Sequence, residues 1–211
     1  MVRRLVNGTL RDAVALLSER DPFLRRLSQR WGVPPLWARP PGFPTLIRII
    51  LEQQVSLAAA ATLYKRLMRH AGGMTPHAIA AMGTEGLREF GLTRQKSAFC
   101  HGLAVRILDG SLDLAAVSRA PDDEGRAMLL SVHGLGPWSV DIYFLMALRR
   151  PDIWPQGDLA LAVTLRDAMG LERAPSREEQ REIAEKWKPW RSVAARMVWA
   201  EYLGVRGKLE R

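Results

Sequence analysis

The chain has 211 residues, which is enough for one compact domain or two small lobes. It contains no run of about 18 apolar residues, no apolar leader and only one cysteine, so a membrane span, a signal peptide, a disulfide and a cysteine-based metal cluster are not expected. Lys and Arg number 31 against 22 Asp and Glu, and the net charge of +9 favours a nucleic acid partner, although an Arg-rich proteome would also explain it. We expect a cytoplasmic, bacterial nucleoid-associated protein.

Helix caps and helix breakers divide the chain into predicted helices. Asp21-Pro22 opens one helix, Pro44 starts another, and Ser56 caps a third. Further predicted starts lie at Thr75, Thr84, Thr93, the Ser176/Glu179 capping box and Pro189, and predicted stops at Gly72, Gly91, Gly110 and Gly204. Sustained alternation of apolar and polar residues appears nowhere, so the sequence predicts an all-α protein.

The segment from Leu130 to Ser139 is the first with a functional indication. An apolar helix end runs into Gly134-Leu135-Gly136, and Pro137 stands where the next helix would begin. The two glycines allow positive φ angles and close backbone approach, so that the N–H groups of the turn can point outward and bind a DNA phosphate. A plain connection between two helices is the alternative interpretation.

Asp158 follows Trp154-Pro155-Gln156-Gly157 and stands where another helix begins. Asp is a favoured N-cap residue, and this structural role explains it without any chemistry. The same position also suits catalysis, because a helix N-terminus favours a negatively charged carboxylate. Such a carboxylate can stabilise an oxocarbenium ion that develops at a deoxyribose C1′.

Taken in this order, the hairpin, a helix over 137–150 and the Gly157-Asp158 turn resemble the helix-hairpin-helix DNA glycosylase superfamily. The closest resemblance is to its 3-methyladenine DNA glycosylase II group. It rests on the stretch 50–56 (ILEQQVS), the hairpin with Pro137-Trp138, the Gly157-Asp158 turn and the stretch 187–192 (WKPWRS). Any one of these stretches alone would be unspecific, whereas their order is specific.

The resemblance implies an all-α, two-lobed fold with its active site in the interlobe cleft, in a short form without the N-terminal β-rich domain of longer members. Residues 1–40 would be a helical segment that packs with the C-terminal helices, and residues 41–211 would form the glycosylase core. The implied activity is hydrolysis of the N-glycosidic bond of alkylated bases, 3-methyladenine and 7-methylguanine, in damaged double-stranded DNA. The nucleotide must first leave the stack, since the bond is inaccessible within it. We expect a monomer.

By this resemblance, the catalytic carboxylate of the family falls on Asp158. Trp138 stands where bifunctional relatives carry a nucleophilic Lys, and an indole cannot form a Schiff base, so no lyase step is expected. Trp138 and Trp199 would line the base-binding pocket, with core packing as the alternative for each. Core packing is the prediction for the other five tryptophans, Trp31, Trp37, Trp154, Trp187 and Trp190.

The stretch around Gln54 resembles the loop that fills the gap left by the flipped nucleotide, and Gln54 occupies the place of an apolar wedge in some relatives. Two solvated glutamines at a helix end are the alternative interpretation. The residues expected to contact DNA are Gln53, Gln54, Ser56, His133, Gly134, Gly136 and Ser139. The family's hairpin also binds a monovalent cation through backbone carbonyls, by position those of Leu130, Val132 and Leu135. A structural Na⁺ or K⁺ is thus implied, and no cofactor is expected to be required.

Two other functions remain open from the sequence. One is a glycosylase for oxidised or mispaired bases, although Trp138 argues against the bifunctional kinds and the absence of a four-Cys set argues against the cluster-bearing kinds. The other is a non-catalytic helix-hairpin-helix module that only grips DNA phosphates. Such a module would need neither Asp158 nor a pocket that stacks on a base.

Overall fold

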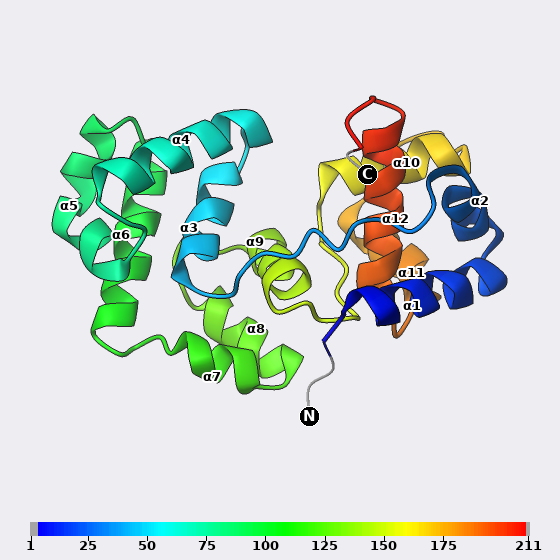
Figure 1. Ribbon diagram of the computed structural model, residues 1–211, viewed down its shortest axis with the longest axis horizontal. Coiled ribbons are helices and arrows are strands. Elements are labelled where there is room, and N and C mark those ends of the chain that lie inside the picture. Colours follow the sequence, from blue (N-terminus) through cyan, green and yellow to red (C-terminus); the bar gives the residue numbers. More distant parts are fainter. Residues whose placement is uncertain (1–3, 210–211) are drawn as a thin grey trace. The chain divides into compact units, whose positions relative to one another are not determined.

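The computed structural model describes residues 4–209, which form helices and contain no strand (Figure 1). This confirms the all-α prediction. Contacts between Cα atoms divide the chain into two compact units, Met1–Ala38 with Phe144–Arg211 and Arg39–Tyr143. We call them the flanking unit and the central unit. Within the described residues, no helix combines the length and the apolar character that a membrane crossing requires.

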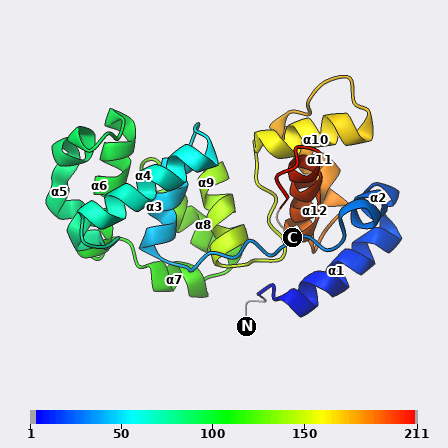
Figure 2. The same ribbon diagram turned by 45° about the horizontal axis from the view of Figure 1, so that its top comes forward.

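The flanking unit is built around its last helix. It contains α1 (Asn7–Arg20), α2 (Pro22–Trp31), α10 (Leu159–Met169), α11 (Arg177–Glu185) and α12 (Arg191–Gly204), and α12 contacts each of the other four (Figure 2). Every residue of α12 from Ser192 to Glu201 is buried. A helix that is buried on all sides is the core of its unit, so the side chains of α12 are well placed to organise a site.

Asp21 fixes the junction between α1 and α2, as its predicted capping role requires. Its Oδ1 accepts a hydrogen bond from the Phe23 N–H at 2.8 Å, and its Oδ2 accepts one from Trp187 Nε1 at 2.8 Å and pairs with Lys186 at 2.9 Å. Burial opposes ionisation of Asp21, but the hydrogen bonds from Lys186 and Trp187 outweigh it and hold the pKa of this carboxyl below its ordinary value.

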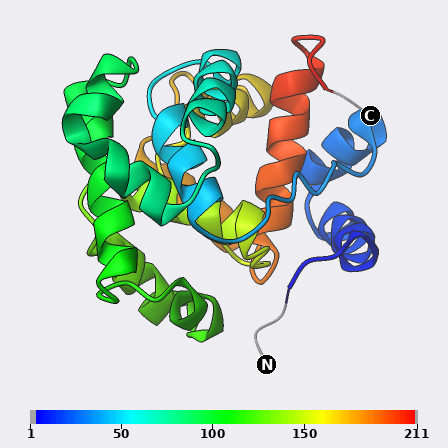
Figure 3. The same ribbon diagram turned by 60° about the vertical axis from the view of Figure 1, so that its left-hand side comes forward.

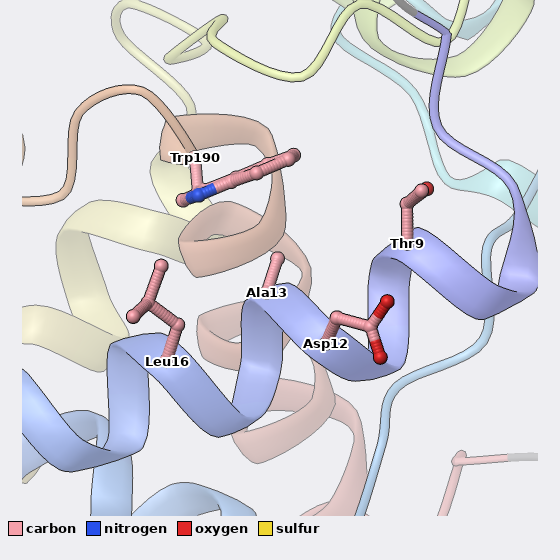
Figure 4. Close-up of a pocket in the computed structure, with 5 residues that line it drawn as sticks. All are labelled: Thr9, Asp12, Ala13, Leu16 and Trp190. Atoms are coloured by element: carbon pink, nitrogen blue, oxygen red, sulfur yellow. The ribbon is translucent and has the colours of Figure 1, made fainter.

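A small cavity lies where α1 meets the start of α12. The ring of Trp190 lies over α1, and the cavity has a volume of about 80 Å³, with a lining of Thr9, Asp12, Ala13, Leu16 and Trp190 (Figure 4). Pockets that enclose a drug-sized ligand have volumes of about 300 Å³ or more. The cavity is therefore a packing feature of the α1 interface and too small for a purine base.

The central unit is built around α3 (Phe43–Glu52), in which eight of the ten residues are buried. This helix contacts α4, α6 and α9. The remaining helices of the unit are α4 (Leu57–His70), α5 (Pro76–Glu89), α6 (Arg94–Leu108), α7 (Leu114–Arg119), α8 (Asp122–Leu130) and α9 (Pro137–Ile142). Two of them, α5 and α6, pack side by side, as the green ribbons of Figure 3 show.

Two predicted helix boundaries are wrong. The helix expected over 137–150 ends at Ile142 and continues as a π-helical turn, Tyr143–Ala147. The last helix begins at Arg191 rather than at Pro189. The start predicted at Thr84 is confirmed, since the backbone of Gly83 is non-helical (φ 63°, ψ 177°) and divides α5 into two helical segments, the second of which begins at Thr84.

Helix α1 had no prediction, because its N-cap is Val6, a residue type that gives no capping signal. The side chain of Thr9 substitutes for a capping residue. Its Oγ1 accepts a hydrogen bond from the Val6 N–H at 3.0 Å and donates one to the Val6 carbonyl at 3.1 Å.

Candidate active site

Asp158 is the N-cap of α10 and is almost fully buried, with 8% of its surface exposed. Its Oδ1 accepts hydrogen bonds from the Leu161 N–H at 3.0 Å and from Trp199 Nε1 at 3.2 Å. The predicted capping role is therefore confirmed, and the catalytic role stays a prediction. The hydrogen bond from Trp199 is not part of the cap, since Trp199 belongs to another helix, α12.

The backbone conformation at residue 157 explains why a glycine precedes this carboxylate. Its φ is +76°, a left-handed conformation that favours glycine, and a Cβ here would lie 2.8 Å from the Nε atom of Arg177. The exposed Arg177 side chain thus packs directly over the backbone next to Asp158. A side chain at residue 157 would be strained at this φ and would displace the Arg177 side chain.

Trp199 also contacts Trp37, a residue predicted to pack in the core. The two ring centroids are 6.4 Å apart and the ring planes meet at 74°, an edge-to-face arrangement. Trp37 is only half-buried, and its φ of +46° is unusual for a bulky residue. The core prediction is confirmed for Trp154, Trp187 and Trp190, and it is wrong for Trp31 and Trp37, which are half-buried.

Arg196, a fully buried arginine of α12, had no predicted role from the sequence. Its guanidinium donates to the Leu36 carbonyl at 2.9 Å, the Ser192 carbonyl at 2.9 Å and the Leu145 carbonyl at 2.8 Å. Burial lowers the pKa of Arg196 to about 9, so the side chain still carries its proton at neutral pH. The Leu145 carbonyl lies in the π-helical turn, and the Leu36 carbonyl lies immediately before Trp37.

In the central unit, the predicted hairpin joins α8 to α9. An ion pair between Arg126 and the buried Asp141 ties the two helices together, and Leu135 is buried in the turn. Gly134 has a φ of +94°, and a Cβ at this residue would overlap the ring of Phe99. The expectation of a special conformation at Gly136 is wrong, because its φ of −79° and ψ of 174° are ordinary extended values.

The loop after α3 is fastened to this hairpin. The side-chain amide of Gln53 donates to the Gly134 carbonyl and to Ser139 Oγ, both at 2.9 Å. Gln54, in contrast, is exposed and has a φ of +56°, and Ser56 caps α4 by accepting from the Ala59 N–H at 3.2 Å. Gln53 therefore positions the loop from inside the unit, while Gln54 is presented at its surface.

Other predicted residues of the hairpin lie at or near the surface. His133 is exposed and meets the ring of Phe99 edge to face, with 4.9 Å between centroids. Trp138 is half-exposed in the first turn of α9, whereas Ser139 beside it is buried. The Ser131 carbonyl accepts a hydrogen bond from Arg106 Nη1 at 2.8 Å. This turn thus offers carbonyl oxygen to a cationic group.

The predicted site residues fall into two groups. Asp158 and Trp199 are in direct contact within the flanking unit. The others belong to the central unit, namely Gln53, Gln54, Ser56, His133, Gly134, Gly136, Trp138 and Ser139. Direct DNA contacts of this second group stay a prediction.

Known proteins with similar sequences indicate the family to which this chain belongs. DNA-3-methyladenine glycosylase of Bacillus subtilis (strain 168) is 25% identical over 201 residues, which cover 87% of this chain and 64% of the relative. The chain thus spans less than two thirds of the length of the first curated relatives that it matches.

Two solved structures share the fold. The crystal structure of DNA-3-methyladenine glycosidase from Bacillus halodurans has a TM-score of 0.79 at 23% identity and covers 93% of this chain and 91% of its own. The Schizosaccharomyces pombe 3-methyladenine DNA glycosylase in complex with abasic DNA has a TM-score of 0.77 at 24% identity, covering 89% and 95%.

The family described as HhH-GPD superfamily base excision DNA repair protein matches residues 47–189. This range contains the loop after α3, the hairpin and Asp158, which are the features that carried the resemblance in the sequence. The chain belongs to the HhH-GPD superfamily of base excision DNA repair proteins.

Proposed function

We propose that this protein is a monofunctional DNA glycosylase that hydrolyses the N-glycosidic bond of alkylated purines in double-stranded DNA. The observation that carries the proposal is the Asp158 carboxylate at the α10 N-terminus, held by the Trp199 indole N–H at 3.2 Å. The membership of the superfamily and the 3-methyladenine glycosylase relatives support the same reaction.

In the proposed reaction, the C1′–N bond of the flipped nucleotide breaks, and its electron pair leaves with the base. The sugar becomes an oxocarbenium ion, and the Asp158 carboxylate stabilises its positive charge. The hydrogen bonds from Leu161 and Trp199 hold the carboxylate in place for this role. A water molecule then adds to C1′ and loses a proton, which leaves an abasic site.

Alkylated purines suit a site that offers aromatic faces. Methylation at N3 of adenine or N7 of guanine makes the base formally cationic, and a cation over an indole gains about 0.5–2 kcal/mol. Trp138, which the resemblance assigns to the base-binding pocket, is half-exposed, and its contact with a base stays a prediction. The positive charge also weakens the glycosidic bond, so that a general acid beside Asp158 is not required. We therefore infer a preference for 3-methyladenine and 7-methylguanine over neutral lesions.

Methylated duplex DNA is expected to accumulate abasic sites when it is incubated with the protein, and no strand nick should accompany them. The reason is that Trp138 supplies no amine for a Schiff base. Abasic sites are counted by alkaline cleavage, nicks by a neutral gel, and covalent adducts by borohydride trapping. A protein that binds DNA but leaves no abasic sites is a binding module. A trapped adduct would instead show that another amine acts as the nucleophile.

The affinity for DNA is expected to fall steeply with salt, because the protein carries a net charge of +9 and the hairpin is proposed to grip phosphates. The slope of log K against log salt should be about −0.9 for each phosphate that is neutralised. Fluorescence anisotropy of an undamaged duplex between low and physiological salt measures this slope. A flat titration would argue against DNA as the partner.

We further propose that the hairpin holds a Na⁺ or K⁺ ion through the carbonyl oxygens of Leu130, Val132 and Leu135. The donor set fits, since the C-terminal end of α8 at Leu130 is the negative end of its dipole and carbonyl oxygens are hard ligands. The ion would stiffen the turn and takes no part in the chemistry. Replacing Na⁺ and K⁺ by tetramethylammonium at constant ionic strength should therefore weaken DNA binding.

A further inference from the structure

Trp37 combines a strained backbone with a side chain that is only half-buried. A φ of +46° is a rare conformation for a bulky aromatic residue, and conformations of this kind persist mainly at functional sites. A tryptophan that served only to fill a core would be expected to bury its ring, as Trp187 does. Trp37 instead leaves part of its surface open to solvent.

The strained conformation is held in place by the core of the flanking unit. The guanidinium of the fully buried Arg196 donates to the Leu36 carbonyl at 2.9 Å, directly before Trp37. Two further hydrogen bonds, to Ser192 and Leu145, fix this guanidinium within the unit. The position of Trp37 is therefore built into the fold.

A short chain of contacts connects Trp37 to the catalytic carboxylate. Its ring meets Trp199 edge to face at 6.4 Å and 74°, and Trp199 Nε1 donates to Asp158 Oδ1 at 3.2 Å. Two indoles at nearly a right angle form an aromatic corner. A planar base that stacks on one of these rings would meet the other ring with its edge.

We propose that Trp37 is a specificity-determining residue that stacks on the flipped, alkylated purine beside Asp158. The inference rests on the proposed function and adds a residue to its base-binding site. An indole face binds a cationic methylated purine more tightly than a neutral one. Trp37 therefore contributes to the selection of the lesion, while Trp199 orients the carboxylate.

The experiment compares Trp37→Leu, which removes the aromatic face, with Trp37→Phe, which keeps one. Single-turnover excision is measured on matched duplexes that carry 7-methylguanine or the neutral lesion hypoxanthine. Inhibition by free 3-methyladenine base reports binding in the site independently of DNA. Trp31→Leu is the matched control, since Trp31 lies in the same unit and bonds to Glu201 instead. Thermal melting identifies variants that fail to fold, and Trp37→Met replaces Trp37→Leu in that case.

Trp37→Leu is expected to lose on the order of 10-fold in rate on 7-methylguanine and a similar factor in inhibition by 3-methyladenine, with a smaller loss on hypoxanthine. Trp37→Phe should retain most of the excision rate and most of the inhibition by 3-methyladenine, and Trp31→Leu should change neither of these two quantities. If the wild type excises 7-methylguanine while Trp37→Leu matches Trp37→Phe in rate and inhibition, this inference alone is wrong. A wild type that removes no alkylated base overturns the proposed function, and this inference with it.

Discussion

Asp158→Asn is expected to lower the single-turnover rate of excision by a factor on the order of 10²–10³, the loss typical when one electrostatic contact to a transition state is removed. The variant keeps the size of the side chain and an oxygen that can accept from the Leu161 N–H and from Trp199 Nε1. It loses the negative charge and exchanges one carboxylate oxygen for an NH2 group. Asn caps helices about as well as Asp, so the melting temperature and the affinity for undamaged DNA should stay close to those of the wild type.

The matched control is Asp113→Asn. Asp113 is the N-cap of α7, where its Oδ1 accepts from the Ala115 N–H at 2.7 Å, so this variant tests the same chemical change at a cap without a proposed catalytic role. It should excise at the wild-type rate. If Asp158→Asn also excises at that rate, Asp158 is only a cap. If it melts far below the wild type, its loss of activity says nothing about charge, and Asp158→Glu with restored charge decides the question.

Features that depend on neighbouring residues were predictable from the sequence. The capping residues Asp21, Ser56, Thr75, Thr93 and Ser176 all accept a hydrogen bond from an N–H within three residues, as predicted. Capping is a local interaction, so the sequence alone contains the information that specifies it. The same holds for Asp158, whose position at a helix start was evident from the Gly157-Asp158 turn.

Features that depend on distant residues were not predictable. Arg196 and Leu36 are 160 residues apart in the sequence. Nothing in either segment indicates that the Arg196 guanidinium is buried and donates a hydrogen bond to the Leu36 carbonyl. The core prediction for Trp37 was wrong, and the carbonyl directly before Trp37 accepts a hydrogen bond from a helix that lies far along the sequence. Trp199 and Asp158 are 41 residues apart, and only the resemblance to a family placed them in one site.

Gly134→Ala is expected to destabilise the central unit by about 2–5 kcal/mol, the combined cost of overpacking and of a strained backbone. A Cβ at this residue would overlap the ring of Phe99, and the φ of +94° is unfavourable for any residue with a side chain. The Gly134 carbonyl also accepts from Gln53, so a displaced hairpin should release the loop that carries Gln54. Urea unfolding measures the stability, and anisotropy measures the affinity for DNA.

Gly136→Ala tests whether any added Cβ in the turn destabilises the central unit, or only one at Gly134. Gly136 has ordinary extended dihedral angles, and a Cβ added at this residue would meet no atom within 4 Å, so the substitution should change the stability by less than about 0.5 kcal/mol. The double variant Gly134→Ala with Phe99→Ala removes the overlap and leaves the strain. It should be less destabilised than the sum of the two single variants. Equal destabilisation by Gly134→Ala and Gly136→Ala would contradict the role of Phe99, and the turn would then require both glycines for its backbone alone.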